Sequence, residues 1–143
     1  MNKIYDSFGF LFAKASIQLQ NEISQFLLKN NLTPKQMGML LVISENDGIT
    51  QKKAGQIQQV DRTTVTQVID YLEKRGYVVR KKIDSDRRAY GLSLTNDGAL
   101  MAKMIYNEID KAQTKYLKKL SNEEIVTLKN ILLLLTMEVD NIE

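Results

Sequence analysis

The sequence predicts a mainly helical domain with one β-hairpin, arranged as four helices, two strands and two helices. Most of the chain carries apolar residues at spacings of three and four, which is the period of an amphipathic helix. Residues 77–94 are instead rich in β-branched and aromatic residues on both sides of a charged turn. With one proline and no low-complexity tract, we expect residues 1–143 to form a single globular domain.

The first two helices are expected at residues 5–30 and 34–44. Apolar residues in the first segment step by three and four, so they share one side of a helix. The second segment is preceded by Thr33, which stands with Gln36 at the spacing of a capping box, and a proline lies in its first turn.

Two further helices follow, separated by a tight turn. Thr50 is placed to cap residues 51–59, and Asp61 is placed to cap residues 62–76. Gly55 lies inside the first of them, where glycine costs about 0.5–1 kcal/mol relative to alanine, so we expect that helix to be loosely held. The apolar side of the second comprises Val65, Val68, Ile69 and Leu72, and its outward side comprises Arg62, Thr63, Thr66, Gln67 and Asp70.

The predicted hairpin consists of strands 77–83 and 89–94 around the polar stretch 84–88. On its second strand Tyr90, Leu92 and Leu94 alternate with Ala89, Gly91 and Ser93, so we expect one face to pack and the other to be small and polar. Two more helices complete the domain. Thr95 is placed to cap one of them, and a second capping box, Ser121 to Glu124, starts the other.

The residue types that are missing exclude several classes of site. The chain contains no cysteine and no histidine, which excludes disulfides, thiol nucleophiles, Cys/His zinc sites and imidazole bases. No pair of carboxylates stands at catalytic spacing, so we expect neither an enzyme nor a bound cofactor or metal. The start of the chain lacks the pattern of a signal peptide, and its longest purely apolar run, 131–135, is far short of the ~20 residues that span a bilayer. We therefore expect a cytoplasmic protein without a membrane partner.

Charge is distributed unevenly along the chain. Residues 50–95 hold ten basic and five acidic residues, whereas the rest holds ten basic and twelve acidic ones. Such a basic middle segment is expected where a protein meets phosphates. In a helix-turn-helix, the second helix enters the major groove of DNA and the first helix contacts the backbone.

Candidate DNA contacts follow from that geometry. Threonine, glutamine and arginine side chains at the start of helix 62–76 are suited to base edges, two lysines in helix 51–59 to phosphates, and an arginine at the hairpin tip to a narrow minor groove. We expect the contacts to come from Thr50, Gln51, Lys52, Lys53, Arg62, Thr63, Thr64, Thr66, Gln67, Arg75, Lys81, Asp86, Arg87 and Arg88.

The final helix is apolar nearly all round, so it must be covered on more than one side, and a second copy of the chain is the simplest cover. We expect its share of a dimer interface to comprise Ile125, Leu128, Leu132, Leu135, Val139 and Ile142.

The stretch VDRTTVTQVIDYLEKRGYVVRKKIDSDRRAYGLSLTNDG resembles the signature region of the multiple antibiotic resistance regulator (MarR) family of winged helix-turn-helix transcription factors. Its most specific parts are 84–88, which resembles that family's wing, and 94–98, which resembles the entry to the following helix. The resemblance implies a DNA-binding module at 33–95 and a helical dimerisation module at 1–32 and 96–143, in which Tyr5 and Phe8 of the first helix contribute to the dimer.

The same resemblance implies a homodimer that binds a pseudo-palindromic operator on double-stranded DNA, usually as a repressor released by a small phenolic or lipophilic effector. It also implies that Asp86 and Arg88 brace the wing. Soft and aromatic side chains suited to an effector pocket between the two modules are Phe8, Phe12, Met37, Met101 and Met104.

Three alternatives stay open from the residues alone. The pocket candidates could be ordinary core residues, the winged helix could bind protein rather than DNA, or the dimer could bind DNA without any response to a ligand. A titration against salt separates DNA from protein as the partner, because DNA binding through n phosphates loses affinity with a log-log slope of about −0.9n.

Overall fold

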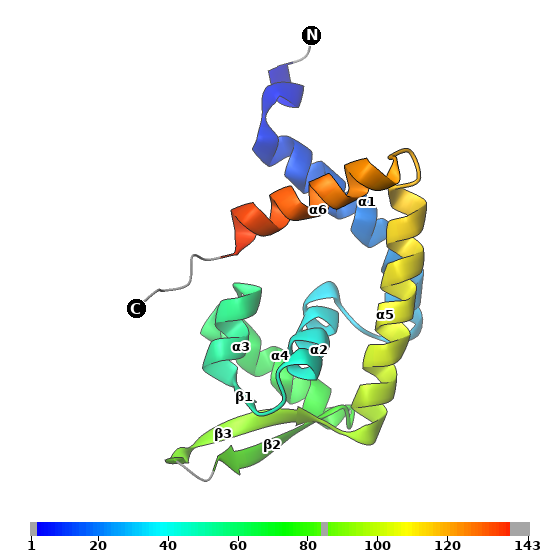
Figure 1. The fold of residues 1–143 in the computed structure, drawn as a ribbon. Helices are drawn as coiled ribbons and strands as arrows, with labels where there is room; N and C mark the ends of the chain where they lie inside the picture. Colours follow the sequence, from blue (N-terminus) through cyan, green and yellow to red (C-terminus); the bar gives the residue numbers. More distant parts are fainter. Residues whose placement is uncertain (1–2, 84–85, 138–143) are drawn as a thin grey trace. The chain divides into compact units, whose positions relative to one another are not determined.

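The computed structural model describes residues 3–83 and 86–137, with the side chains of residues 83–89 outside the described part. The predicted order of α-helices and hairpin strands is confirmed, a short 3₁₀ turn and a two-residue strand are additional, and the described part of the chain is mainly helical (Figure 1). Its elements are η1 (Lys3–Asp6), α1 (Phe8–Lys29), α2 (Pro34–Glu45), β1 (Ile49–Thr50), α3 (Gln51–Gln58), α4 (Arg62–Lys74), β2 (Val78–Ile83), β3 (Asp86–Leu94), α5 (Asn96–Tyr116) and α6 (Asn122–Thr136).

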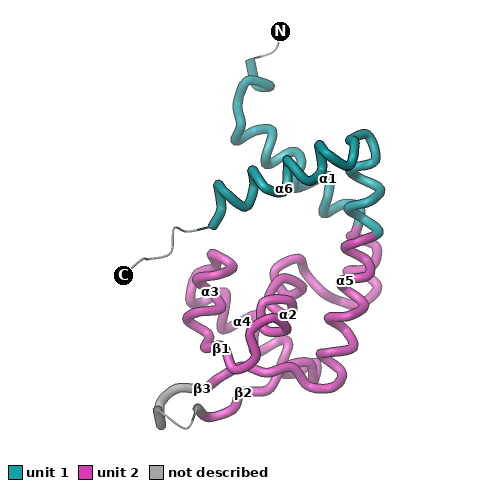
Figure 2. The backbone as a smooth tube through the Cα atoms, in the orientation of Figure 1, with its two compact units in different colours: residues 1–22, 111–143 teal, residues 23–110 magenta. Residues whose placement is uncertain are grey.

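The chain forms two compact units (Figure 2). Residues 1–22 and 111–143, teal in Figure 2, make up unit 1, here called the terminal unit. Residues 23–110, magenta in Figure 2, make up unit 2, here called the hairpin unit. The boundaries between the units fall inside α1 and α5. The hairpin unit therefore contains α2, α3, α4 and all three strands.

The start of the first helix differs from the prediction. Residues 3–6 form a 3₁₀ turn, and the α-helix begins at Phe8 rather than at Tyr5. The hydroxyl of Ser7 accepts a hydrogen bond of 3.2 Å from the backbone N–H of Phe10. A serine side chain that takes up one of the free amides at a helix start favours a helix beginning just after it.

The predicted helix caps are confirmed. Thr33 accepts a bond from the amide of Gln36, whose side chain accepts one from the amide of Thr33, and Ser121 and Glu124 repeat this capping box at α6. Thr50 and Asp61 cap α3 and α4. These local signals position the start of α4, where the candidate DNA contacts gather.

The sheet has a third strand that the sequence did not indicate. The two-residue strand β1 pairs antiparallel with β3, opposite Leu92 and Gly91, and gives the strand order β1-β3-β2. Two residues are too few to show a period along the sequence.

The faces of β3 also differ from the expected alternation. Leu92 is fully buried, but Tyr90 is 46% exposed, and Gly91 and Ser93 of the supposedly polar face are buried. A Cβ atom at Gly91 would lie 2.7 Å from the carbonyl oxygen of Gly48, so the turn before β1 covers this face. β3 is thus the central strand, packed on more sides than a hairpin strand would be.

The expectation that α3 is loosely held is wrong. Ala54 is fully buried, and a Cβ atom at Gly55 would lie 2.8 Å from a methyl carbon of Val65 in α4. The glycine lets α3 approach α4 more closely than any side chain would allow. The helix-turn-helix is consequently tightly packed at its turn.

The core of the hairpin unit lies between its helices and the sheet. The apolar side of α4 that the sequence predicts is confirmed, since all four of its residues are buried. The largest fully buried side chains are Met39, Leu40, Ile43, Ile69, Leu72, Val78, Leu92 and Ile105.

Candidate nucleic-acid interface

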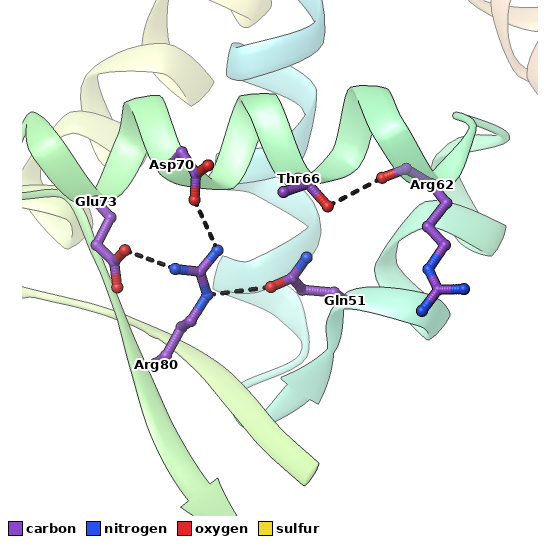
Figure 3. Close-up of polar contacts among 6 residues, drawn as sticks. All are labelled: Gln51, Arg62, Thr66, Asp70, Glu73 and Arg80. Carbon is purple, nitrogen blue, oxygen red and sulfur yellow. Dashed lines mark hydrogen bonds and ion pairs between the residues drawn. The ribbon is translucent and has the colours of Figure 1, made fainter. Parts of the chain in front are cut away.

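The exposed side of α4 at its N-terminal end presents four polar side chains, here called the recognition face: Arg62, Thr63, Thr66 and Gln67. They are exposed because the opposite side of the helix is buried in the core. The hydroxyl of Thr66 donates a hydrogen bond of 3.1 Å to the backbone carbonyl of Arg62 (Figure 3). The oxygen of Thr66 is therefore left to act as an acceptor, and its methyl group as an apolar contact.

Thr64 has a structural role at the start of the same helix. Its amide donates a 2.7 Å hydrogen bond to the carboxylate of Asp61, and the residue is half-buried. Hydrogen bonds from the side chain and backbone of Thr64 lower the pKa of Asp61 below its usual value. Asp61 thus stays ionised and caps the helix.

The start of α3 divides its predicted contact residues into two kinds. Lys52 and Lys53 are exposed. Thr50 instead accepts a hydrogen bond of 3.2 Å from the amide of Lys53, and the side-chain oxygen of Gln51 accepts one of 3.0 Å from Arg80. The two lysines are thus free to meet an anionic partner, whereas Thr50 and Gln51 hold the local structure.

Arg80 of β2 is a functional candidate that reasoning from the sequence missed. Its guanidinium donates to Glu73 at 2.7 Å and to Asp70 at 2.9 Å, both on α4, as well as to Gln51 (Figure 3). Asp70 and Glu73 are three residues apart and so share one side of a helix. The spacing of the two carboxylates could have indicated that they bind one cation. Nothing in the neighbouring sequence, however, identified Arg80 as that cation.

Arg75 is held inside the hairpin unit. Its guanidinium donates to the carbonyl oxygens of Asn30 and Asn31 at 3.1 and 3.2 Å, and to the hydroxyls of Tyr71 and Tyr77. The hydrogen bond to Tyr71 is the main cause that raises the pKa of Arg75. Because these bonds join the end of α1 to the end of α4, we assign Arg75 a structural role.

The predicted contacts of the hairpin are only partly described. Lys81 and Lys82 are exposed on β2 and pair with Gly91 and Tyr90 of β3. The backbone of β3 begins at Asp86, three residues before the predicted start of that strand. The side chains of Asp86, Arg87 and Arg88 lie outside the described part, so their contacts stay a prediction.

The terminal unit carries the candidate dimer residues on a largely apolar surface. Phe8 is 75% exposed and Leu135 is 65% exposed, while Ile125 is half-buried. Tyr5, Leu128 and Leu132 are also partly exposed. Val139 and Ile142 lie outside the described residues.

Within the same unit, polar contacts join α1 to α5. The hydroxyl of Tyr116 donates to the side-chain oxygen of Gln18 at 2.6 Å, and Lys115 pairs with Glu22 at 3.1 Å. These contacts fix the two helices relative to each other within the terminal unit.

The candidate effector residues are divided between the units. Phe8 and Phe12 belong to the terminal unit, and both are exposed. Met37, Met101 and Met104 belong to the hairpin unit, where Met101 is buried in the core, Met37 is half-buried and Met104 is exposed. Met101 accordingly has the environment of an ordinary core residue.

Two further findings concern residues 3–83 and 86–137. They contain no group of three or more acidic side chains placed to hold a metal ion. No helix among them has the length and apolar character needed to cross a membrane.

Comparison with known proteins places the chain in a family. Residues 30–89 match the sequence model of the MarR family. The chain is 31% identical to the organic hydroperoxide resistance transcriptional regulator of Bacillus subtilis over 131 residues. The matched stretch covers 91% of this chain and 87% of that protein. The chain belongs to the MarR family.

Solved structures of MarR-like proteins share the fold. CouR from Rhodococcus jostii RHA1, bound to p-coumaroyl-CoA, superposes with a TM-score of 0.84 at 19% identity and covers all of both chains. The S. aureus MepR–DNA complex gives a TM-score of 0.75 at 24% identity, covering 88% of this chain and 93% of that one. The winged helix-turn-helix fold expected from the sequence is confirmed, with β2 and β3 as the wing.

Proposed function

We propose that this MarR-family chain is a homodimeric, sequence-specific DNA-binding repressor, which a small lipophilic or phenolic effector releases from its operator. The observation that carries DNA binding is the recognition face at the N-terminal end of α4, beside two exposed lysines at the start of α3. In a helix-turn-helix this end of the second helix meets the base edges. The S. aureus MepR–DNA complex, which shares the fold, supports DNA as the partner.

The side chains of this surface suit two different tasks. The amide of Gln67 can donate to and accept from one adenine, and threonine methyl groups can contact thymine. Arg62 can reach a guanine or a phosphate. Lys52 and Lys53 are point charges suited to phosphates, which position a protein without reading sequence. We therefore assign sequence preference to α4 and general affinity to the start of α3.

Homodimerisation is supported by the apolar surface of the terminal unit. Besides Phe8, Leu134 of α6 is 82% exposed. Large apolar residues exposed in such number on one unit favour an association site. A symmetric dimer would use the same surface on both copies. The two copies of α4 would then need to lie about 34 Å apart to enter successive major grooves on one side of the DNA.

The proposed effector is a small lipophilic or phenolic molecule. CouR, which has the same fold and was solved with p-coumaroyl-CoA, provides a precedent for binding a ligand that carries a phenolic group. The sequence contains no cysteine, so a response of these 143 residues to oxidants cannot proceed through a thiol. Phe8, Phe12, Met37, Met101 and Met104 stay the candidate contacts. A ligand can release the operator only by as much as it prefers the unbound form of the dimer.

The deciding experiment is a titration of the purified chain with its own upstream DNA and with a random duplex, at several salt concentrations, together with its mass in solution. The proposal predicts a dimer that prefers its upstream DNA and loses affinity steeply as salt rises. Absence of binding to either duplex would contradict it and would favour a winged helix that binds protein.

Release by an effector is tested on the same complex. Phenolic and other small lipophilic compounds are added at increasing concentration, and the apparent Kd for upstream DNA is recorded. A rise in Kd supports the proposed release. An unchanged Kd with every compound would support the alternative of a dimer that binds DNA without responding to ligands.

A further inference from the structure

Arg80 is a cation on the proposed DNA-binding module, yet its guanidinium is directed onto the protein (Figure 3). Each of its three nitrogens donates to a side-chain oxygen: Nε to Gln51, one terminal nitrogen to Glu73 and the other to Asp70, at 3.0, 2.7 and 2.9 Å. Only 26% of the side chain is exposed. Three of its five N–H donors are therefore occupied within the protein.

These bonds connect three separate elements. Arg80 comes from β2, its two carboxylate partners come from the second half of α4, and Gln51 is the first residue of α3. Because a guanidinium is planar and donates in fixed directions, it fixes an orientation as well as balancing charge. Arg80 pairs with Leu92 of β3 in the sheet, so the constraint reaches both strands of the wing.

The same carboxylates belong to the side of α4 that faces away from the core. Asp70 is four residues after Thr66 and three after Gln67, so it continues the recognition face along the helix. Its side chain is 51% exposed. Carboxylates at such a place repel phosphates, and charge alone therefore predicts that removing them strengthens DNA binding.

We propose that Arg80 is a positioning residue for DNA recognition. It holds the β2–β3 wing in one orientation against α4 and α3, so that the wing and the recognition face can meet the same operator. The inference rests on the proposed DNA-binding function and assigns Arg80 no contact with DNA. It also means that Asp70 and Glu73 support operator binding despite their charge.

The test removes the arginine in one variant and its two carboxylate partners in another, so the two variants change the net charge in opposite directions. Arg80→Gln removes one positive charge, and Asp70→Asn with Glu73→Gln removes two negative charges. For each, Kd is measured for the upstream DNA and for a random duplex. Positioning predicts that both changes reduce the preference for upstream DNA, by about tenfold for an interaction within one ion-pair network.

Matched controls remove the same charges elsewhere. Lys103→Gln in α5 is the control for Arg80→Gln, and Asp110→Asn with Glu123→Gln is the control for the double change. All three positions are exposed. We expect these controls to change affinity for both duplexes alike and to keep the preference.

Two further variants separate orientation from charge. Arg80→Lys keeps the charge but loses the planar guanidinium. We therefore expect its preference for upstream DNA to lie between that of the wild type and that of Arg80→Gln. The variant that combines Arg80→Gln with both amide substitutions is expected to have the same preference for upstream DNA as Arg80→Gln alone. All three substitutions remove the same ion pairs, so their effects should not add.

Hydrogen exchange of the free protein tests the constraint without DNA. The amides of β2 and β3 should exchange faster in Arg80→Gln and in the double variant, while those of α2 stay unchanged. Unchanged exchange in the wing would overturn the inference, and so would tighter binding of both duplexes by the double variant with its preference intact. A wild type that binds neither duplex would instead contradict the proposed function itself.

Discussion

Gly98 packs against the backbone carbonyl group of Tyr77, and a Cβ atom at this position would overlap that carbonyl. The same carbonyl oxygen accepts a 3.0 Å hydrogen bond from the amide of Thr95. The hydroxyl of Thr95 accepts from the amide of Gly98 at 3.0 Å and donates to the carbonyl of Gly76. The start of α5 is thereby fixed to the start of the wing.

Replacing Gly98 by alanine is expected to lower the free energy of unfolding by about 1–3 kcal/mol, because the backbone must shift to admit the methyl group. Urea denaturation measures the change. Gly9→Ala in α1 is the matched control, since a Cβ atom there meets nothing closer than 3.7 Å. Equal effects of the two substitutions would show that the contact with Tyr77 does not require glycine at position 98.

Arg75→Ala is expected to destabilise the protein without changing how DNA binding depends on salt. The substitution removes the arginine donor from the carbonyl of Asn30, while the carbonyl of Asn31 keeps the hydroxyl of Tyr71 as a donor. The loss for one partly buried carbonyl is about 1–3 kcal/mol. Unfolding and the salt slope of DNA binding are measured on the same sample. A flatter salt slope would show that Arg75 contacts phosphate after all.

Gln67→Ala and Lys53→Ala are expected to affect DNA binding differently. If Gln67 reads a base, its loss weakens upstream DNA by about 1–3 kcal/mol and relaxes the preference at one position. Loss of Lys53 weakens all duplexes alike and flattens the salt slope by about one unit. Both follow from salt titrations with upstream and random duplexes, and identical behaviour of the two variants would refute this division of roles.

Introducing aspartate at Leu132 and Leu135 is expected to separate the dimer, because two charges would be buried at the proposed interface. The mass in solution should fall to that of one chain, and binding to a paired operator should be lost. Asn130→Asp, on an exposed polar position of α6, should leave the dimer intact. A monomer that still binds the operator tightly would contradict binding through paired half-sites.

The capping carboxylate of Asp61 is expected to make stability depend on pH. Hydrogen bonds from Thr64 lower its pKa in the folded chain, below the value of about 3.9 that holds in the unfolded chain. Its stabilising effect is thus complete above the unfolded pKa and is lost as pH falls through the lower, folded pKa. The gap in unfolding free energy between the wild type and Asp61→Ala should be widest near neutral pH and should narrow in acid. A gap that stays constant down to acid pH would contradict the ionised cap.

Local patterns predicted much of this molecule. The caps at Thr33, Thr50, Asp61 and Ser121 and the apolar side of α4 could be found because each depends on residues within one or two turns. The same periodicity left the recognition face on the outside of α4. Together with the resemblance of the wing, these patterns were sufficient for the fold and the family.

Other features could not be found locally. Strand β1 is two residues long, and its pairing with β3 depends on a partner some forty residues away. The role of Gly55 becomes visible only beside Val65, because its helix propensity alone suggests instability. The hydrogen-bond partners of Arg75 and Arg80 likewise lie on other elements, so no local pattern could indicate them.

The sequence by itself determined the order of the α-helices and of the two hairpin strands, the helix caps, the exposed polar start of α4 and the family, since these depend on period, spacing and motif. Only the tertiary structure decided which charged side chains remain available to a partner. Arg75 and Arg80 read as surface cations in the sequence, but carbonyls and carboxylates from distant segments occupy their guanidinium groups. The physical reason is that a hydrogen bond depends on the position of both groups in space, and the chain brings them together only when it folds.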